Sequence, residues 1–106
     1  MGRTGSQPQR SAQVVCKTPT PGKAPVAIEA WKHACVRRAI LDVLPRDGDG
    51  MRFIDLPDAV RRQLGPEELR TLGSVSWYVT TVKLDLEVKG EVRRQPGTPQ
   101  RLVRTR

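Results

Sequence analysis

The last third of the chain most constrains what it can fold into. Four apolar residues recur there at steps of four, three and four, which places them on one face of a helix; they are Val75, Val79, Val82 and Leu86. Gly90 follows, and glycine readily adopts the positive φ that ends many helices. The chain then runs on as an arginine-rich segment that turns through Pro-Gly-Thr-Pro at 96–99. The pattern predicts a long helix followed by a C-terminal β-hairpin, with Leu102 and Val103 on the returning strand.

A second apolar stripe predicts another helix nearer the N-terminus. Pro25 favours a helix start, and Pro45 ends the pattern, so we expect this helix to reach about Leu44. Its inward face would carry Ile28, Trp31, Cys35, Ala39 and Val43, widened by Val36 and Ile40. His33 falls on the opposite side of the wheel and is therefore expected at the surface.

Between these two helices the pattern indicates shorter elements. Residues 46–50, Arg-Asp-Gly-Asp-Gly, are typical of a turn; a calcium loop fails because Met51 occupies its fifth position. Residues 51–54 are expected to form a short strand that could pair with the C-terminal hairpin. A helix to about Leu64 follows Asp55, the expected N-cap. A further helical turn covers 66–72, and Ser74 is expected to cap the long helix.

The first 25 residues have a different composition from the rest. They are rich in Pro, Gly, Ser, Thr and Gln and show no sustained periodicity. Ordering such a segment would cost more conformational entropy than its small apolar content returns. The sequence therefore predicts a disordered, basic, Pro/Gly-rich arm over 1–25 and a folded domain over 26–106.

The net charge of +8 lies mainly at the two ends of the chain. Residues 1–25 contribute +4 and residues 92–106 contribute +5, in each case with no acidic residue, while the body between them is nearly neutral. Two basic extensions around a neutral core are a plausible footprint for phosphate binding. The alternative is that the arginines only keep a small protein soluble.

Little in the sequence points to catalysis, a metal or a cofactor. There is one histidine and no Cys-x-x-Cys, P-loop or glycine-rich nucleotide fingerprint. Cys16 and Cys35 are too far apart to suggest a metal motif or a disulfide framework, which fits a reducing cytosol. Asp85 and Glu87 are two apart on a helix and point in different directions, with no histidine near them in sequence. We therefore expect no enzyme activity, and neither cofactor nor metal.

No stretch is apolar enough to predict a membrane span, and the N-terminus lacks the apolar region of a secretory signal. A cytoplasmic protein is expected.

The C-terminal motif resembles that of small bacterial domains of unknown function. The likeness rests on Trp77, the run Leu-Asp-Leu-Glu at 84–87 and Gly90, with similar prolines and glycine around 19–25. More broadly, the order of elements over 26–106 resembles winged helix-turn-helix domains. The resemblance implies a mainly α fold with a small β-hairpin, in which three helices precede a C-terminal wing. It also implies binding to duplex DNA, with the third helix in the major groove and the wing on the backbone.

Two functions remain open. In the first, the wing arginines grip phosphates and the long helix faces DNA; the candidate contacts are Arg93, Arg94, Arg101, Arg104, Lys83, Thr80 and Ser76. That helix, however, has an apolar outer stripe, Trp77, Leu84 and Val88, where a base-reading helix normally shows polar and basic side chains.

In the second function, the stripe binds a protein partner or a second copy of the chain. The stripe could also be covered from within the chain. The N-terminal arm could fold back over it, or Trp77 could simply complete the core around Trp31.

Overall fold

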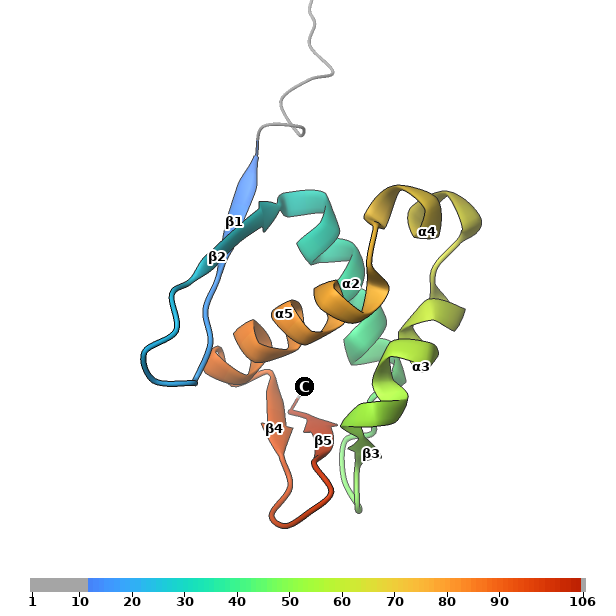
Figure 1. Cartoon of the computed structure of the whole chain (residues 1–106). Coiled ribbons are helices and arrows are strands. Elements are labelled where there is room, and N and C mark those ends of the chain that lie inside the picture. The colour runs from blue at the N-terminus through green and yellow to red at the C-terminus, as the bar shows by residue number, and fades with distance from the viewer. Residues whose placement is uncertain (1–11, 106) are drawn as a thin grey trace, which may run out of the picture.

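The computed structural model describes residues 12–105 and contains helices together with two small antiparallel sheets (Figure 1). In chain order the elements are β1 (Gln13–Cys16), β2 (Val26–Glu29), α2 (Ala30–Val43), β3 (Met51–Arg52), the short 3₁₀ helix η1 (Phe53–Asp55), α3 (Leu56–Gln63), α4 (Pro66–Leu72), α5 (Val75–Val88), β4 (Val92–Arg94) and β5 (Arg101–Arg104).

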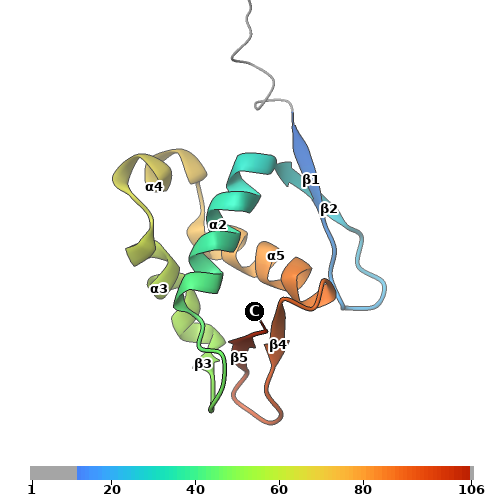
Figure 2. The same ribbon diagram turned by 180° about the vertical axis from the view of Figure 1, so that it is seen from behind.

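The long helix α5 lies at the centre, crossed by α2 and contacted by α3, as both views of the chain show (Figure 1 and Figure 2). All four residues of its predicted inward stripe are buried, and Val79, Val82 and Leu86 are wholly inaccessible to solvent. The Ser74 hydroxyl accepts a hydrogen bond from the Trp77 amide at 3.2 Å, which confirms the predicted cap. Gly90 has φ +78°, as its place after the helix requires.

The C-terminal hairpin forms as predicted and is joined by the short strand β3. The order in this sheet is β3-β5-β4, and Met51 pairs with Leu102. Leu102 and Val92 point into the core, where they are at most 2% exposed. Gly50 precedes β3 with φ +83°, and a Cβ there would lie 2.6 Å from the Leu102 carbonyl oxygen. The close approach of the turn to β5 therefore requires glycine.

The first predicted helix begins later than expected. Residues Val26–Glu29 form β2, and α2 starts only at Ala30, so the expected start at Pro25 is wrong. The backbone of this segment pairs with β1 instead, and Ile28 is buried at 4% exposure. The rest of the stripe is confirmed at Cys35, Val36, Ala39 and Ile40, whereas Trp31 and Val43 are only partly buried.

The N-terminal segment is ordered from residue 13, which contradicts the predicted disordered arm. β1 pairs antiparallel with β2 from Gln13 opposite Glu29 to Cys16 opposite Val26. Cys16 is 3% exposed and belongs to the main core cluster. The folded unit therefore includes this hairpin, and a domain boundary at 25/26 is wrong. Residues 1–11 of the predicted arm lie outside the described residues.

Between α2 and α5 the predicted elements are present. Leu56, Val60 and Leu64 are buried, and α4 covers the predicted turn. Asp55 precedes α3, but its side chain makes no capping hydrogen bond and instead pairs with Arg52 at 3.2 Å. Within residues 12–105, no helix is long and apolar enough to cross a membrane. The fold is thus a mixed arrangement of helices with small sheets.

Candidate functional site

The outer side of α5 lies between two hairpins, β1–β2 and β4–β5 (Figure 1). A groove of about 560 Å³ separates α5 from the first of these hairpins. Its walls contain two lysines and no acidic residue; they are Cys16, Lys17, Thr18, Thr20, Lys23, Ala24, Val26, Ser76, Trp77, Thr80, Thr81 and Leu84. The groove is therefore an apolar and hydroxyl-lined hollow with a positive rim.

The predicted apolar stripe lies partly in this groove. Trp77 is 46% exposed and lines it together with the half-buried Leu84, while Val88 is 44% exposed and lies outside the lining. Trp77 therefore does not complete the core. Because residues 16–26 form the opposite wall, the N-terminal segment does fold back over part of α5, which is one of the arrangements that the sequence leaves open.

Lys83 does not lie on the exposed side of α5, contrary to its assignment as a DNA contact. Its side chain is 2% exposed, and its ammonium donates to Glu87 Oε2 at 2.7 Å and to Gln100 Oε1 at 2.9 Å. It also lies 4.6 Å from the centre of the Phe53 ring. Burial is the main cause that lowers the pKa of Lys83. The lysine holds α5 to the C-terminal sheet and cannot reach a phosphate.

Two arginines of the C-terminal hairpin are restrained by the fold, Arg94 by an ion pair and Arg104 by partial burial. The Arg94 guanidinium donates to Glu87 Oε1 at 2.7 Å, although its side chain is still 45% exposed. Arg104 is half-buried, and its buried Nε has no hydrogen-bond partner among residues 12–105. Ser76 and Thr80, the other two predicted DNA contacts, lie on the wall of the groove.

The other two arginines of the hairpin, Arg93 and Arg101, lie on the same sheet face as Arg52 of β3. Arg101 pairs directly with Arg52, and Arg93 lies opposite Val103, so the three arginines share one sheet face. Asp55 offsets Arg52, but within residues 12–105 neither Arg93 nor Arg101 makes an ion pair. Like charges directly opposite each other destabilise a sheet. An anion bound at this face would relieve that repulsion.

A smaller hollow of about 440 Å³ lies between the β1–β2 loop and the C-terminal hairpin. It is lined by Pro19, Thr20, Pro21, Glu87 and Arg94. The groove and this hollow share Thr20 in their walls.

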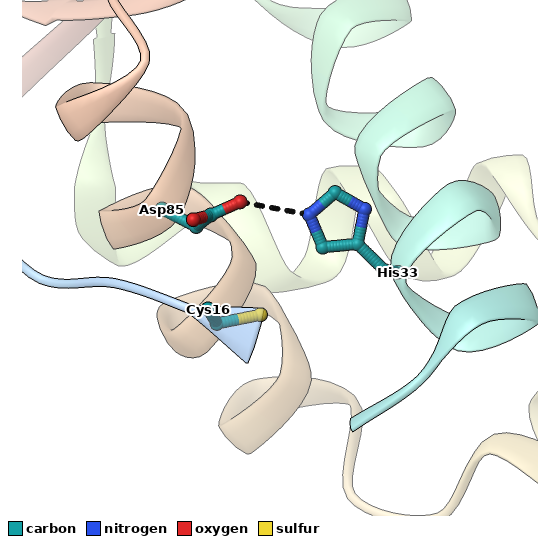
Figure 3. A group of neighbouring side chains, drawn as sticks. All are labelled: Cys16, His33 and Asp85. Atoms are coloured by element: carbon teal, nitrogen blue, oxygen red, sulfur yellow. Dashed lines mark hydrogen bonds and ion pairs between the residues drawn. The ribbon is translucent and has the colours of Figure 1, made fainter. Parts of the chain in front are cut away.

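A buried polar cluster, which no pattern in the sequence predicts, lies beside the groove. His33 on α2 is 8% exposed rather than at the surface, and its Nε2 donates to Asp85 Oδ2 at 2.9 Å. Asp85 on α5 is wholly buried. Figure 3 shows that Cys16, at the end of β1, points toward the same place. The sulfur, a ring nitrogen and a carboxylate oxygen all lie within 4.8 Å of one another.

The carboxylate of Asp85 is the acceptor at the centre of this cluster. It also accepts from the Lys17 amide at 3.0 Å and pairs with the Lys89 ammonium at 2.8 Å. Burial by itself would raise the pKa of Asp85, but the hydrogen bonds from Lys17, Lys89 and His33 outweigh it and leave the pKa below its ordinary value. Asp85 is thus an ionised carboxylate that holds β1 and α2 against α5.

Both cysteines are free and buried. Burial, followed by the charge of Asp85, raises the pKa of Cys16 to about 11. Burial raises the pKa of Cys35 to the same range, and its thiol donates to Glu68 Oε2 at 3.4 Å. Because the thiolate is the nucleophilic form, neither cysteine is activated for covalent catalysis. The prediction that Cys35 is a small buried residue is confirmed.

The cluster leaves no motif in the sequence because its members are 17 and 52 residues apart in the chain. Only the tertiary structure brings β1 next to α2 and α5. One signal in the sequence could have helped. The chain's single histidine, His33, follows the apolar segment 26–28, and pairing that segment with 13–16 would have brought Cys16 near the start of the helix that carries His33.

No curated protein and no solved structure matches the chain. A family model described as a family of unknown function (DUF6958) matches residues 13–102. The match begins at the first residue of β1 and ends within β5, so it includes both hairpins and all the helices of the described fold. The chain therefore belongs to this family of unknown function, DUF6958.

Proposed function

We propose that the chain is a winged helix-turn-helix protein that binds duplex DNA mainly through the phosphate backbone. The order of elements supports this assignment. A short strand between the first two helices pairs with the last strand of a C-terminal hairpin, in the order β3-β5-β4, and the hairpin follows a long third helix. In this arrangement α2, α3 and α5 are the three helices, β4–β5 is the wing, and α4 is an added turn before α5.

The observation that carries the proposal is the clustering of arginines on the wing sheet. Arg52, Arg93 and Arg101 share one face, and two of them have no carboxylate partner among the described residues. Arginine is well suited to phosphate, because its planar fork can donate two hydrogen bonds to one anion. A DNA backbone would supply the negative charge that this sheet face lacks.

The first hairpin adds positive charge on the other side of α5. Lys17 and Lys23 lie on the rim of the groove, and their segment stands where a second wing would flank the helix. A helix flanked by two basic hairpins can approach a duplex while both hairpins contact phosphates. This placement supports backbone binding from both sides of α5.

The exposed side of α5 itself favours weak sequence discrimination. Ser76 and Thr80 can donate or accept hydrogen bonds, but Lys83 is buried and no arginine, asparagine or glutamine lies on the helix. Direct readout depends mainly on such side chains in the major groove. Phosphate contacts fix the position of a protein without reading sequence.

The test is fluorescence anisotropy of the full chain with labelled random-sequence duplex DNA at several salt concentrations. Arg93→Glu combined with Arg101→Glu should weaken DNA binding. It should also make the slope of log K against log salt concentration shallower by about two, because two phosphate contacts are lost. Arg62→Glu with Arg70→Glu makes the same change of charge on α3 and α4 and serves as the matched control. An equal loss of DNA affinity in both double variants would show that only overall charge matters and would contradict a specific role for the hairpin. An unchanged affinity of the Arg93→Glu, Arg101→Glu variant would overturn the proposal.

A second candidate function is protein interaction through the outer side of α5, and the exposure of Trp77 and Val88 favours it. Exposed tryptophan is a frequent anchor of protein interfaces. Replacing Trp77 and Leu84 with serine should then abolish a dimer seen by sedimentation while the circular dichroism spectrum is kept. If the wild-type chain is a monomer at all concentrations, self-association through this stripe is excluded.

A further inference from the structure

We propose that Cys16, His33 and Asp85 form a binding site for a divalent transition-metal ion of the zinc class. The three residues come from β1, α2 and α5, and all three are buried. Their sulfur, nitrogen and oxygen atoms converge to within 4.8 Å (Figure 3). The site is separate from the wing arginines on which the proposed DNA binding rests.

The donor set points to the class of metal. Thiolate and imidazole are ligands that zinc and its neighbours in the first transition row prefer, whereas calcium and magnesium take oxygen ligands. Zinc is commonly held by a mixture of cysteine, histidine and carboxylate ligands in tetrahedral sites. One ligand of each type fits that chemistry and does not fit a calcium or magnesium site.

The separation between His33 and Asp85 is close to that of a tetrahedral site, whereas the cluster as a whole spans up to 4.8 Å and must contract around an ion. With metal–ligand bonds of about 2.0–2.1 Å to nitrogen and oxygen, two ligand atoms on a tetrahedral ion lie roughly 3.3 Å apart. His33 Nε2 and Asp85 Oδ2 are 2.9 Å apart, so a small opening of this pair admits an ion. The hydrogen bond between them is replaced by two bonds to the metal, and the imidazole proton leaves Nε2 as the ring changes to the tautomer protonated at Nδ1.

A cation can bind the cluster only by replacing the positive charge that already neutralises Asp85. Lys89 already places its ammonium 2.8 Å from Asp85 Oδ2, and its side chain is 45% exposed. An incoming divalent ion would displace this ammonium into solvent and take its place beside the carboxylate. Meanwhile Asp85 Oδ1 would keep the hydrogen bond from the Lys17 amide at 3.0 Å.

The three residues leave a fourth coordination position, and the groove provides access to it. Cys16 and Lys17 form part of the groove wall, so the buried cluster adjoins the groove through Cys16. Zinc sites with three protein ligands keep the fourth position for water or a small ligand. When the metal binds, a bond forms from Cys16 Sγ to the ion, and the thiol proton is released to solvent.

The experiment uses the full chain and Co²⁺ as a spectroscopic substitute for zinc. Wild-type protein titrated with Co²⁺ should develop a thiolate-to-cobalt charge-transfer band and visible bands of tetrahedral intensity, and one equivalent of Zn²⁺ should remove them. Zn²⁺ should also raise the unfolding temperature, because the ion binds only the folded arrangement of β1, α2 and α5. Absence of the charge-transfer band in the wild-type chain would overturn the proposal without any variant.

Variants then identify the ligands. Cys16→Ser, His33→Gln and Asp85→Asn should each weaken zinc binding by more than about 100-fold, since even residues that only support ligands can account for 10–100-fold. Cys35→Ser is the matched control, because Cys35 is equally buried but lies next to Glu68. It should keep the band. Loss of the band in Cys35→Ser with retention in Cys16→Ser would place the metal elsewhere and contradict the site.

Discussion

At the scale of single residues, three polar side chains take up buried positions: His33, Lys83 and Asp85. Residues of these types are rarely buried unless they are paired. Here each has a partner: His33 on α2 pairs with Asp85 on α5, and Lys83 pairs with Glu87 one turn further along α5 and with Gln100 before β5. A helical wheel places a residue by angle and type alone, so it assigned His33 and Lys83 to the surface.

The buried role of Lys83 leads to a prediction about stability. Lys83→Met removes the donor to Glu87 and Gln100 but keeps a chain of similar length in the same space. We expect the free energy of unfolding to fall by about 1–3 kcal/mol, because the buried acceptors lose a partner. Denaturant unfolding measures this. Lys23→Met, on the exposed loop, should change stability by less than about 0.5 kcal/mol. An equally stable Lys83→Met protein would mean that the lysine does not fasten α5 to the sheet.

At the scale of elements, α3, α4, α5 and the C-terminal hairpin followed their patterns, whereas the start of α2 and the first hairpin did not. The inward stripe of α5 persists along the whole helix, so a periodicity is visible. β1 and β2 have four residues each, and Val26, Ala27 and Val15 are not buried although they are apolar. In so short a strand the alternation of buried and exposed residues carries little signal. The pairing between β1 and β2 is a contact across the loop 17–25 that no local pattern specifies.

The hairpin is expected to matter for folding. Deleting residues 1–25 removes β1, the buried Cys16 and the Lys17 amide that donates to Asp85. We expect the free energy of unfolding to drop by at least about 2 kcal/mol, from lost apolar burial and an unsatisfied buried carboxylate. Thermal or urea unfolding is the measurement. Val15→Ala, at a residue 53% exposed, should cost little. A truncated chain as stable as the full one would restore the idea of an arm that contributes nothing to the fold.

At the scale of the whole molecule, positive charge is divided between two hairpins on either side of α5. Lys17 and Lys23 are on the β1–β2 loop, and Arg93 and Arg101, which make no ion pair among residues 12–105, are on the C-terminal hairpin. Arg46 and Arg62 are likewise outside the ion pairs of the described residues but stand apart from one another. The helical body between them pairs many of its charges internally, as in Arg37 with Glu91 and Arg61 with Asp58. The excess charge is therefore presented at the hairpins.

This division predicts the salt dependence of DNA binding. If about four cations of the two hairpins each neutralise one phosphate, the logarithm of the association constant should fall against the logarithm of salt concentration with a slope of about −3.6. Titrations with one duplex at a series of salt concentrations give the slope directly. A slope near zero would show that affinity does not come from phosphate contacts. Duplexes of different sequence should bind within a narrow range of affinities, because α5 offers few base-reading side chains.

The sequence by itself determined α5, its cap at Ser74, the glycine stop and the C-terminal hairpin, because each depends on neighbours within one turn or one hairpin. It also located the charge at the ends. The tertiary structure alone decided that residues 13–16 pair with β2, that Lys83 is buried, and that Cys16, His33 and Asp85 meet. Those outcomes depend on contacts between residues up to 69 positions apart in the chain, where the free energy of packing, and not local propensity, selects the partner.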